Sequence, residues 1–164
     1  MTVFRYMTRL FGRKRQVGCL FLCRKTGKLL LVERRIDDDG QSSWGMIGGP
    51  VYVDESMIEA AIRYAEQHAG YVKQPEDDLI KIDVYANPEV RHITFLYVID
   101  EDFFRVYGDD YQAVVWVDLV PWPQKEWPRP LDRYIVSMLY NDRAVCKVLA
   151  EIRKAATETF ENSL

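Results

Sequence analysis

Short apolar runs alternate with polar turns along this chain, a pattern that predicts several β-strands and a small number of helices. Two runs, 17–23 and 29–32, flank a turn that contains Gly27, which is typical of a β-hairpin. Further strands are predicted at 79–86, 92–99 and 113–119. The run 93–99 is rich in β-branched and aromatic residues, so we expect it to lie centrally in its sheet.

A helix is predicted to begin at Ser56 and to end at Gly70. Ser56 and Glu59 have the spacing of a capping box, and a glycine commonly terminates a helix. At about 100° per residue, one face is apolar and is expected to dock on a core: Met57, Ile58, Ala61, Ile62 and Ala65. A second face carries Glu55, Glu59, Arg63 and Glu66, and a third carries Ala60, Tyr64, Gln67 and His68.

Two helices are predicted to finish the chain, separated by Asn141 and Asp142. The apolar stripe of the first is Leu131, Ile135, Met138 and Leu139, and that of the second is Val145, Val148, Leu149 and Ile152. A proline-rich connector, 121–130, precedes them, and its Trp122 and Trp127 either cap the core or stack a base or partner.

The composition is that of one soluble domain. The chain has 164 residues with 48% apolar and 29% charged positions, enough for one full core but short for two. No apolar run reaches the length of a membrane span and no secretory signal precedes the first strand, so we expect a cytoplasmic protein. Three cysteines, an odd number, argue against a disulfide framework and favour buried thiols over a metal site.

The charge is distributed unevenly. Residues 1–32 contain eight lysines or arginines and no acid, whereas 33–164 contain fourteen bases and twenty-five acids; the whole chain has a net charge of −3. Residues 2–15 also form a basic amphipathic segment, which either packs on its own domain or lies on a membrane or partner. Its end, Arg13, Lys14 and Arg15, is the candidate contact for nucleic acid.

The most specific pattern is the spacing of four residues around the predicted helix. Five residues separate Gly49 from Glu55, seven separate Glu55 from Arg63, and six separate Arg63 from Gly70. This spacing resembles the signature of the Nudix hydrolase superfamily. In that family three glutamates after the arginine bind divalent cations, and at the matching positions this chain has Tyr64, Gln67 and His68.

The resemblance implies an α/β fold, namely a Nudix-type α/β/α sandwich with a mixed sheet. The box helix would lie on one side and the C-terminal helices on the other. It covers 16–140, with 1–15 as the basic N-terminal segment and 141–164 as a helical extension beyond the usual fold. This extension either forms a contact in a homodimer or covers the sheet. Gly49, Glu55, Arg63 and Gly70 would have structural roles, with Glu55 and Arg63 as an ion pair that braces loop and helix.

The favoured hypothesis is a degenerate, non-catalytic domain that binds a nucleotide-like or RNA ligand, or a protein partner. A face of Tyr, Gln and His supplies no negative charge for Mg²⁺, so neither a metal nor another cofactor is expected. The ligand surface would combine basic, aromatic, glycine and box-helix positions: Arg34, Arg35, Trp44, Gly48, Gly49, Tyr52, Tyr64, Gln67 and His68.

The alternative is an active hydrolase of a nucleoside diphosphate linked to another group, with Mg or Mn in a rearranged site. Its cation ligands would come from Glu55, Glu66, Asp109 and Asp110, with His68 as the base. The last two belong to an acidic loop at 100–111, whereas the acidic run 37–39 is expected to be solvated surface. Glu66 lies about 100° around the helix from Gln67 and cannot simply replace it. A third class is an assembly subunit that uses only the fold.

Overall fold

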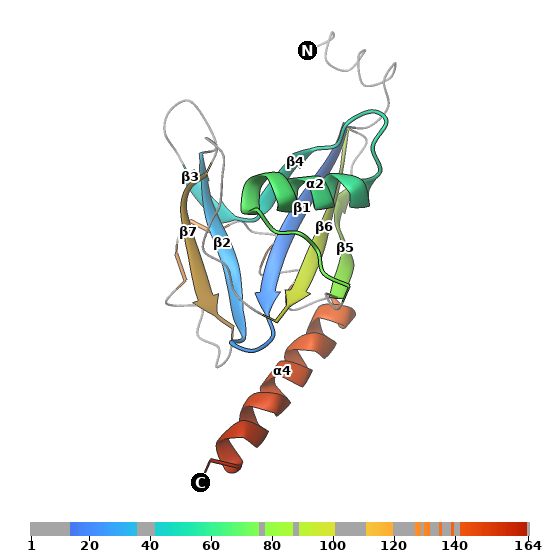
Figure 1. The fold of residues 1–164 in the computed structure, drawn as a ribbon. Helices are drawn as coiled ribbons and strands as arrows, with labels where there is room; N and C mark the ends of the chain where they lie inside the picture. Colours follow the sequence, from blue (N-terminus) through green and yellow to red (C-terminus); the bar gives the residue numbers. More distant parts are fainter. Residues whose placement is uncertain are drawn as a thin grey trace.

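The computed structural model describes residues 14–35, 42–75, 78–86, 89–100, 111–119, 127–128, 130–131, 135, 139 and 142–163. Within these ranges a seven-stranded sheet is accompanied by two helices (Figure 1). The elements in chain order are β1 (Lys14–Cys23), β2 (Lys28–Arg35), β3 (Ser42–Gly45), β4 (Ile47–Pro50), α2 (Met57–Ala69), β5 (Asp78–Ala86), β6 (Val90–Ile99), β7 (Tyr111–Asp118) and α4 (Arg143–Glu161).

The sheet divides where β1 and β2 separate. These strands pair only next to their turn, at Leu22 with Leu29 and Cys23 with Lys28. Beyond that point β3 pairs with β2 and β4 pairs with β1, so the two short strands fill the widening gap. β6 runs parallel to β1 and has β5 on its other side, while β7 pairs with the far side of β2. The sheet is therefore mixed, and the strand containing 93–99 is interior, as predicted.

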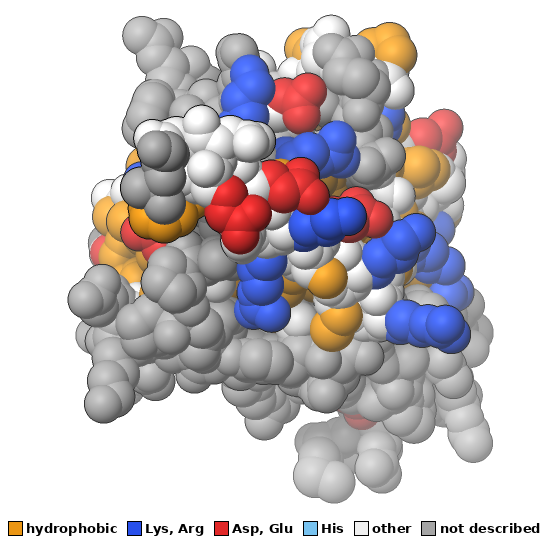
Figure 2. All heavy atoms as spheres, turned by 90° about the horizontal axis from the view of Figure 1, so that it is seen from below, with side chains coloured by type: hydrophobic (Ala, Val, Ile, Leu, Met, Phe, Trp, Pro, Cys, Tyr) orange, Lys and Arg blue, Asp and Glu red, His pale blue; other side chains and the backbone are white. Residues whose placement is uncertain are grey.

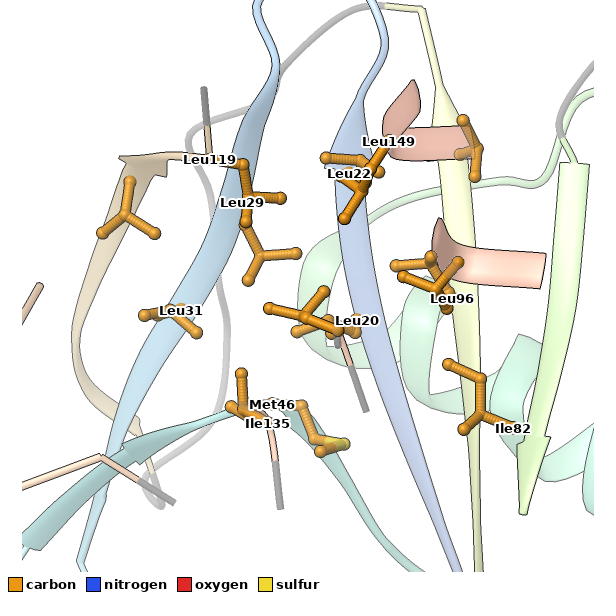
Figure 3. Packing of buried hydrophobic residues seen from close by; sticks show 14 of the residues in the cluster. Leu20, Leu22, Leu29, Leu31, Met46, Ile82, Leu96, Leu119, Ile135 and Leu149 are labelled. Carbon is orange, nitrogen blue, oxygen red and sulfur yellow. The ribbon is translucent and has the colours of Figure 1, made fainter. Parts of the chain in front are cut away.

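Each face of the sheet has its own apolar core, because side chains alternate between faces along a strand. On one face Val17, Cys19 and Phe21 pack with the buried residues of α2. On the other, Leu20 and Leu22 pack with residues near the C-terminus, of which Ile135, Leu139, Val145, Leu149 and Ile152 are buried (Figure 3). This arrangement confirms the predicted α/β/α sandwich.

Helix α2 has the limits that its capping residues predict. The Ser56 hydroxyl accepts from Glu59 N–H and the Glu59 carboxylate accepts from Ser56 N–H. Gly70 ends the helix in the left-handed region, with φ 62°. The prediction of which residues of α2 face the core, however, was wrong in part. Ile58 is 46% exposed, whereas the face that packs on the sheet consists of Ala60, Ala61, Tyr64, Ala65 and Ala69. The alanines let the helix approach β1 and β4 closely, and this fit decides its rotation.

Helix α4 also follows the prediction. The Asp142 carboxylate accepts from Ala144 N–H and Val145 N–H, which caps the helix at the predicted break. Its first half packs on the core, while every described residue from 153 onward is exposed. Figure 2 shows the molecule from below, which is the side on which α4 lies in Figure 1. On this side basic and acidic side chains lie close to one another. No described helix is long and apolar enough to cross a membrane.

Several predicted features lie outside the described residues: 1–13, 37–39, 101–110, Trp122 and most of 131–141. Ile135 and Leu139 are helical and buried, in agreement with the predicted stripe. Trp127 is buried and its indole N–H donates to Asp118 O at 3.1 Å, so it caps the core. Cys19 and Cys23 are buried thiols as expected, but Cys146 is exposed on α4.

Candidate functional site

The glycine pair at Gly48 and Gly49 lets β4 approach its neighbours closely. Gly48 has φ 153°, and a Cβ built there would lie 2.1 Å from Val17 O. A Cβ on Gly49 would lie 2.4 Å from Tyr64 Oη. The sequence predicted close approach to a ligand at this pair. The structure shows close approach to the β1 backbone and to Tyr64.

Glu55 and Arg63 form a bidentate ion pair between the loop after β4 and α2. Arg63 Nε donates to Glu55 Oε1 at 2.7 Å and Arg63 Nη2 donates to Glu55 Oε2 at 2.8 Å. Arg63 Nη2 also lies 3.3 Å from Pro50 O, and Tyr52 N–H donates to Glu55 Oε2 at 3.1 Å. The geometry is that of a brace between loop and helix.

Aromatic rings flank Arg63 of this pair, and the pKa of each partner is shifted in the direction that favours its charged form. The Arg63 guanidinium carbon lies 4.0 Å from the ring centroid of Tyr52 and 4.4 Å from that of Tyr64. The hydrogen bond from Arg63 lowers the pKa of Glu55 against the opposing effect of burial, with a contribution from Tyr52 N–H. That hydrogen bond also raises the pKa of Arg63. Both groups therefore remain charged in the folded protein over a wide pH range.

The positions that resemble the family's glutamates carry two rings and an amide. Tyr64 is buried and its hydroxyl donates to Pro50 O at 3.1 Å. His68 is half-buried and stacks on Tyr64, with ring centroids 5.2 Å apart and planes at 25°. Gln67 is exposed, as is Glu66. This part of α2 therefore presents hydrogen-bond donors and rings, and Glu66 is exposed next to them in the sequence.

Tyr111, the first residue of β7, joins this helix face to the sheet. The Tyr111 hydroxyl accepts from Gly48 N–H at 3.2 Å, and its ring meets His68 edge-on at 5.4 Å between centroids. The Arg34 guanidinium carbon lies 5.6 Å from the centroid of the Tyr111 ring, and the two residues are register partners. Arg34 and His68, both predicted site residues, thus both contact the Tyr111 ring.

Tyr111 was missed because the sequence pattern predicts it as the last residue of the acidic loop at 100–111, with the strand beginning at 113. The available signal was its place in the loop in which a replacement carboxylate was sought. A pairing of 34 with 111 depends on strand register across a large sequence separation, which a residue pattern does not supply.

Other predicted site residues lie elsewhere. Trp44, predicted to lie on the ligand surface, is half-buried and packs against the core on the face opposite α2, with its backbone bridged to Leu131. Tyr52 is 58% exposed, and its ring covers Arg63. The side chain of Arg35, and Arg13, Asp109 and Asp110 entirely, lie outside the described residues.

The two described members of the basic end differ. Lys14 is exposed at the start of β1. Arg15 Nη2 donates to Tyr52 O at 2.6 Å and to Val53 O at 3.2 Å, so it supports the loop before α2. A contact between Arg15 and nucleic acid would therefore have to compete with these backbone acceptors.

The residues on this face of α2 do not fit a divalent cation. Tyr64 directs its hydroxyl proton at the Pro50 carbonyl, and both oxygens of Glu55 already accept hydrogen bonds. Within the described ranges no group of three or more His, Cys, Asp or Glu side chains could hold a metal ion. Mg²⁺ and Mn²⁺ prefer carboxylate and other oxygen ligands, which this face does not supply as a set.

Comparison with known proteins places this geometry in a family. The NUDIX domain model matches residues 12–134, which is most of the chain. A sequence comparison with curated proteins found no match.

Solved structures share the fold. The solution structure of the E. coli ORF135 protein has a TM-score of 0.54 and 19% identity, over 90% of this chain and 95% of that one. A MutT structure from a study of Aliivibrio salmonicida and Vibrio cholerae has a TM-score of 0.53 and 17% identity, over 85% and 98%. A MutT/nudix family protein from Enterococcus faecalis has a TM-score of 0.50 and 21% identity over 71% of this chain, which spans 51% of that protein.

These identities establish the fold alone, and the match to the domain model establishes the family. The spacing of Gly49, Glu55, Arg63 and Gly70 and the mixed sheet around α2 agree with both. The chain belongs to the NUDIX domain family.

Proposed function

We propose that this chain is a non-catalytic member of the family that binds a nucleotide-like ligand without a divalent cation. The observation that carries the proposal is the occupation of the three glutamate positions by Tyr64, Gln67 and His68, with the Tyr64 hydroxyl bound to Pro50 O. Cleavage of a diphosphate depends on cations that neutralise developing charge and activate water. Without carboxylates on this helix face, that route lacks its metal ligands.

The same face carries groups that recognise an anionic ligand. Arg34 carries a guanidinium group, which suits bidentate contact with phosphate oxygens. His68 and Gln67 can donate hydrogen bonds to the same kind of acceptor. The Tyr111 ring contacts both Arg34 and His68, and its hydroxyl is held by Gly48 N–H, so it links the two residues to one place on the sheet. The ligand would be a nucleoside diphosphate or a related phosphate ester.

The position of Glu55 weighs against a rearranged catalytic site. Its two oxygens accept hydrogen bonds from Arg63 and Tyr52 N–H, so a cation at Glu55 would have to break the brace between loop and helix. Hydrolysis and binding of RNA alone are the outcomes of the experiments below that would count against this proposal.

The first experiment measures turnover. Release of phosphate or nucleotide is followed for nucleoside diphosphate derivatives and capped RNA with Mg²⁺ and Mn²⁺, for the wild type and for a variant with Tyr64→Glu, Gln67→Glu and His68→Glu. We expect no turnover by the wild type. Wild-type turnover that a chelator abolishes would refute the non-catalytic assignment.

The second experiment measures binding of ADP by calorimetry in the presence of chelator. We expect Arg34→Ala to weaken binding at least about tenfold, the loss that corresponds to about one charge-assisted hydrogen bond. Arg153→Ala, at an exposed position on α4, is the control and should leave the affinity unchanged. Absence of ADP binding by the wild type, or equal affinity in both variants, would contradict the proposed site. Tight, salt-sensitive binding of RNA alone would point to the basic end instead.

A further inference from the structure

We propose that Tyr64 anchors the box helix to β4 in place of a metal, and that position 64 determines whether this fold can hold a divalent cation at all. The inference deepens the proposed function and rests on it in one respect, that α2 binds no cation in the natural protein. It concerns how the helix is held, so it makes predictions about stability that need no ligand.

The first argument is the position of the Tyr64 hydroxyl. It donates to Pro50 O at 3.1 Å and lies where a Cβ on Gly49 would come within 2.4 Å. The hydroxyl therefore sits directly against the β4 backbone, in a space that Gly49 leaves open. Tyr64 is 8% exposed, so this hydrogen bond is largely shielded from water.

The second argument is the fixed orientation of the Tyr64 ring. Its neighbours are the Arg63 guanidinium, 4.4 Å from the ring centroid, and the stacked His68 ring at 5.2 Å. The ring also belongs to the apolar core between α2 and the sheet. A side chain held on these sides cannot readily swing away to admit an ion beside the Pro50 carbonyl.

The third argument is electrostatic. Pro50 O accepts from Tyr64 Oη and lies 3.3 Å from Arg63 Nη2, so its acceptor capacity is used by the protein itself. A glutamate at 64 would instead bring a second acceptor toward this carbonyl in a buried place. The Arg63 guanidinium is already engaged by Glu55 and Pro50 O, so a buried carboxylate at 64 is costly, and a cation or a proton would relieve that cost. Tyrosine at 64 removes the need for either.

It follows that carboxylates at 67 and 68 alone do not rebuild a cation site. Gln67 is exposed and His68 half-buried, so glutamates there would lie at the helix surface while Tyr64 still covers the Pro50 carbonyl. A change at 64 is needed to remove the Tyr64 hydroxyl from that carbonyl, which then keeps only Arg63 Nη2 of its two described donors.

The test compares thermal unfolding with Mn²⁺ and with chelator, without nucleotide. The variants are Gln67→Glu/His68→Glu, the triple variant that adds Tyr64→Glu, and Tyr64→Phe. We expect Mn²⁺ to leave the Tm of the wild type and of the double variant unchanged and to raise that of the triple variant by several degrees. Stabilisation of the wild type, equal stabilisation of the double and triple variants, or a folded triple variant indifferent to Mn²⁺ would overturn the proposal.

Tyr64→Phe keeps the proposal testable if the triple variant does not fold. It removes only the hydroxyl, so we expect the Tm to fall by about 2–4 °C and amide exchange in α2 to become faster. An unchanged Tm would refute the anchoring role. Because no nucleotide is present, these outcomes are separate from the ADP experiment. ADP binding can fail while Tyr64 anchors the helix, and the reverse can also hold.

Discussion

The ion pair between Glu55 and Arg63 offers the sharpest test of how the box helix is held. The perturbation is a double-mutant cycle with Glu55→Ala, Arg63→Ala and both together. The two side chains are 12% and 16% exposed, respectively, and joined by two charge-assisted hydrogen bonds. Removal of Glu55 leaves a guanidinium group with one carbonyl and two rings as neighbours.

The expected loss of unfolding free energy for each substitution lies between two limits. Exposed ion pairs contribute about 0–1 kcal/mol to the free energy of unfolding. Removing one partner of a fully buried pair lowers that free energy by about 3–5 kcal/mol. With roughly an eighth of each side chain exposed, we expect each single substitution to cost about 2–3 kcal/mol and the pair to be coupled by at least about 1 kcal/mol. In a chain of this size that loss corresponds to a Tm lower by roughly 4–12 °C.

The assay is urea unfolding at pH 7 and at lower pH. The pKa of Glu55 is lowered in the folded protein, so its contribution is present above its unfolded pKa of about 4.3 and is lost as the pH falls through the folded value. The difference between wild type and Glu55→Ala should therefore shrink below about pH 4. The control is Glu158→Gln, which breaks the exposed pair with Lys154 and should cost no more than about 0.5 kcal/mol.

One result would refute this reasoning directly. If the coupling energy in the cycle is near zero at pH 7, or if Glu55→Ala costs no more than Glu158→Gln, the pair does not brace the loop against the helix. The bidentate geometry would then be incidental to stability.

Three further substitutions probe the glycines and the cap. Gly48→Ala should destabilise the protein by more than about 3 kcal/mol, because its Cβ would meet Val17 O, whereas Gly70→Ala, with only a positive φ to accommodate, should cost about 1 kcal/mol. Equal losses in denaturant unfolding would show that β4 shifts to relieve the clash. Ser56→Ala should cost about 1 kcal/mol through loss of the cap. Unchanged exchange of the amides in the first turn of α2 would argue against that cap.

Local patterns predicted much of the fold because they act over a few residues. The capping pair Ser56 and Glu59 and the terminator Gly70 determine the limits of α2, since each satisfies or accommodates backbone groups within one turn. Asp142 does the same for α4. The strands were likewise predicted from local patterns, whereas the sandwich with a mixed sheet was predicted from the family resemblance that the box spacing carries.

The tertiary structure alone decided which faces and residues meet. The sequence pattern placed Ile58 inward and Tyr64 outward, but the rotation of α2 depends on how its alanines fit against β1 and β4. The approach of Arg34 and His68 to Tyr111 depends on strand register. Periodicity reports how apolar a face is, and it carries no information about the shape or register of the partner that the face will contact.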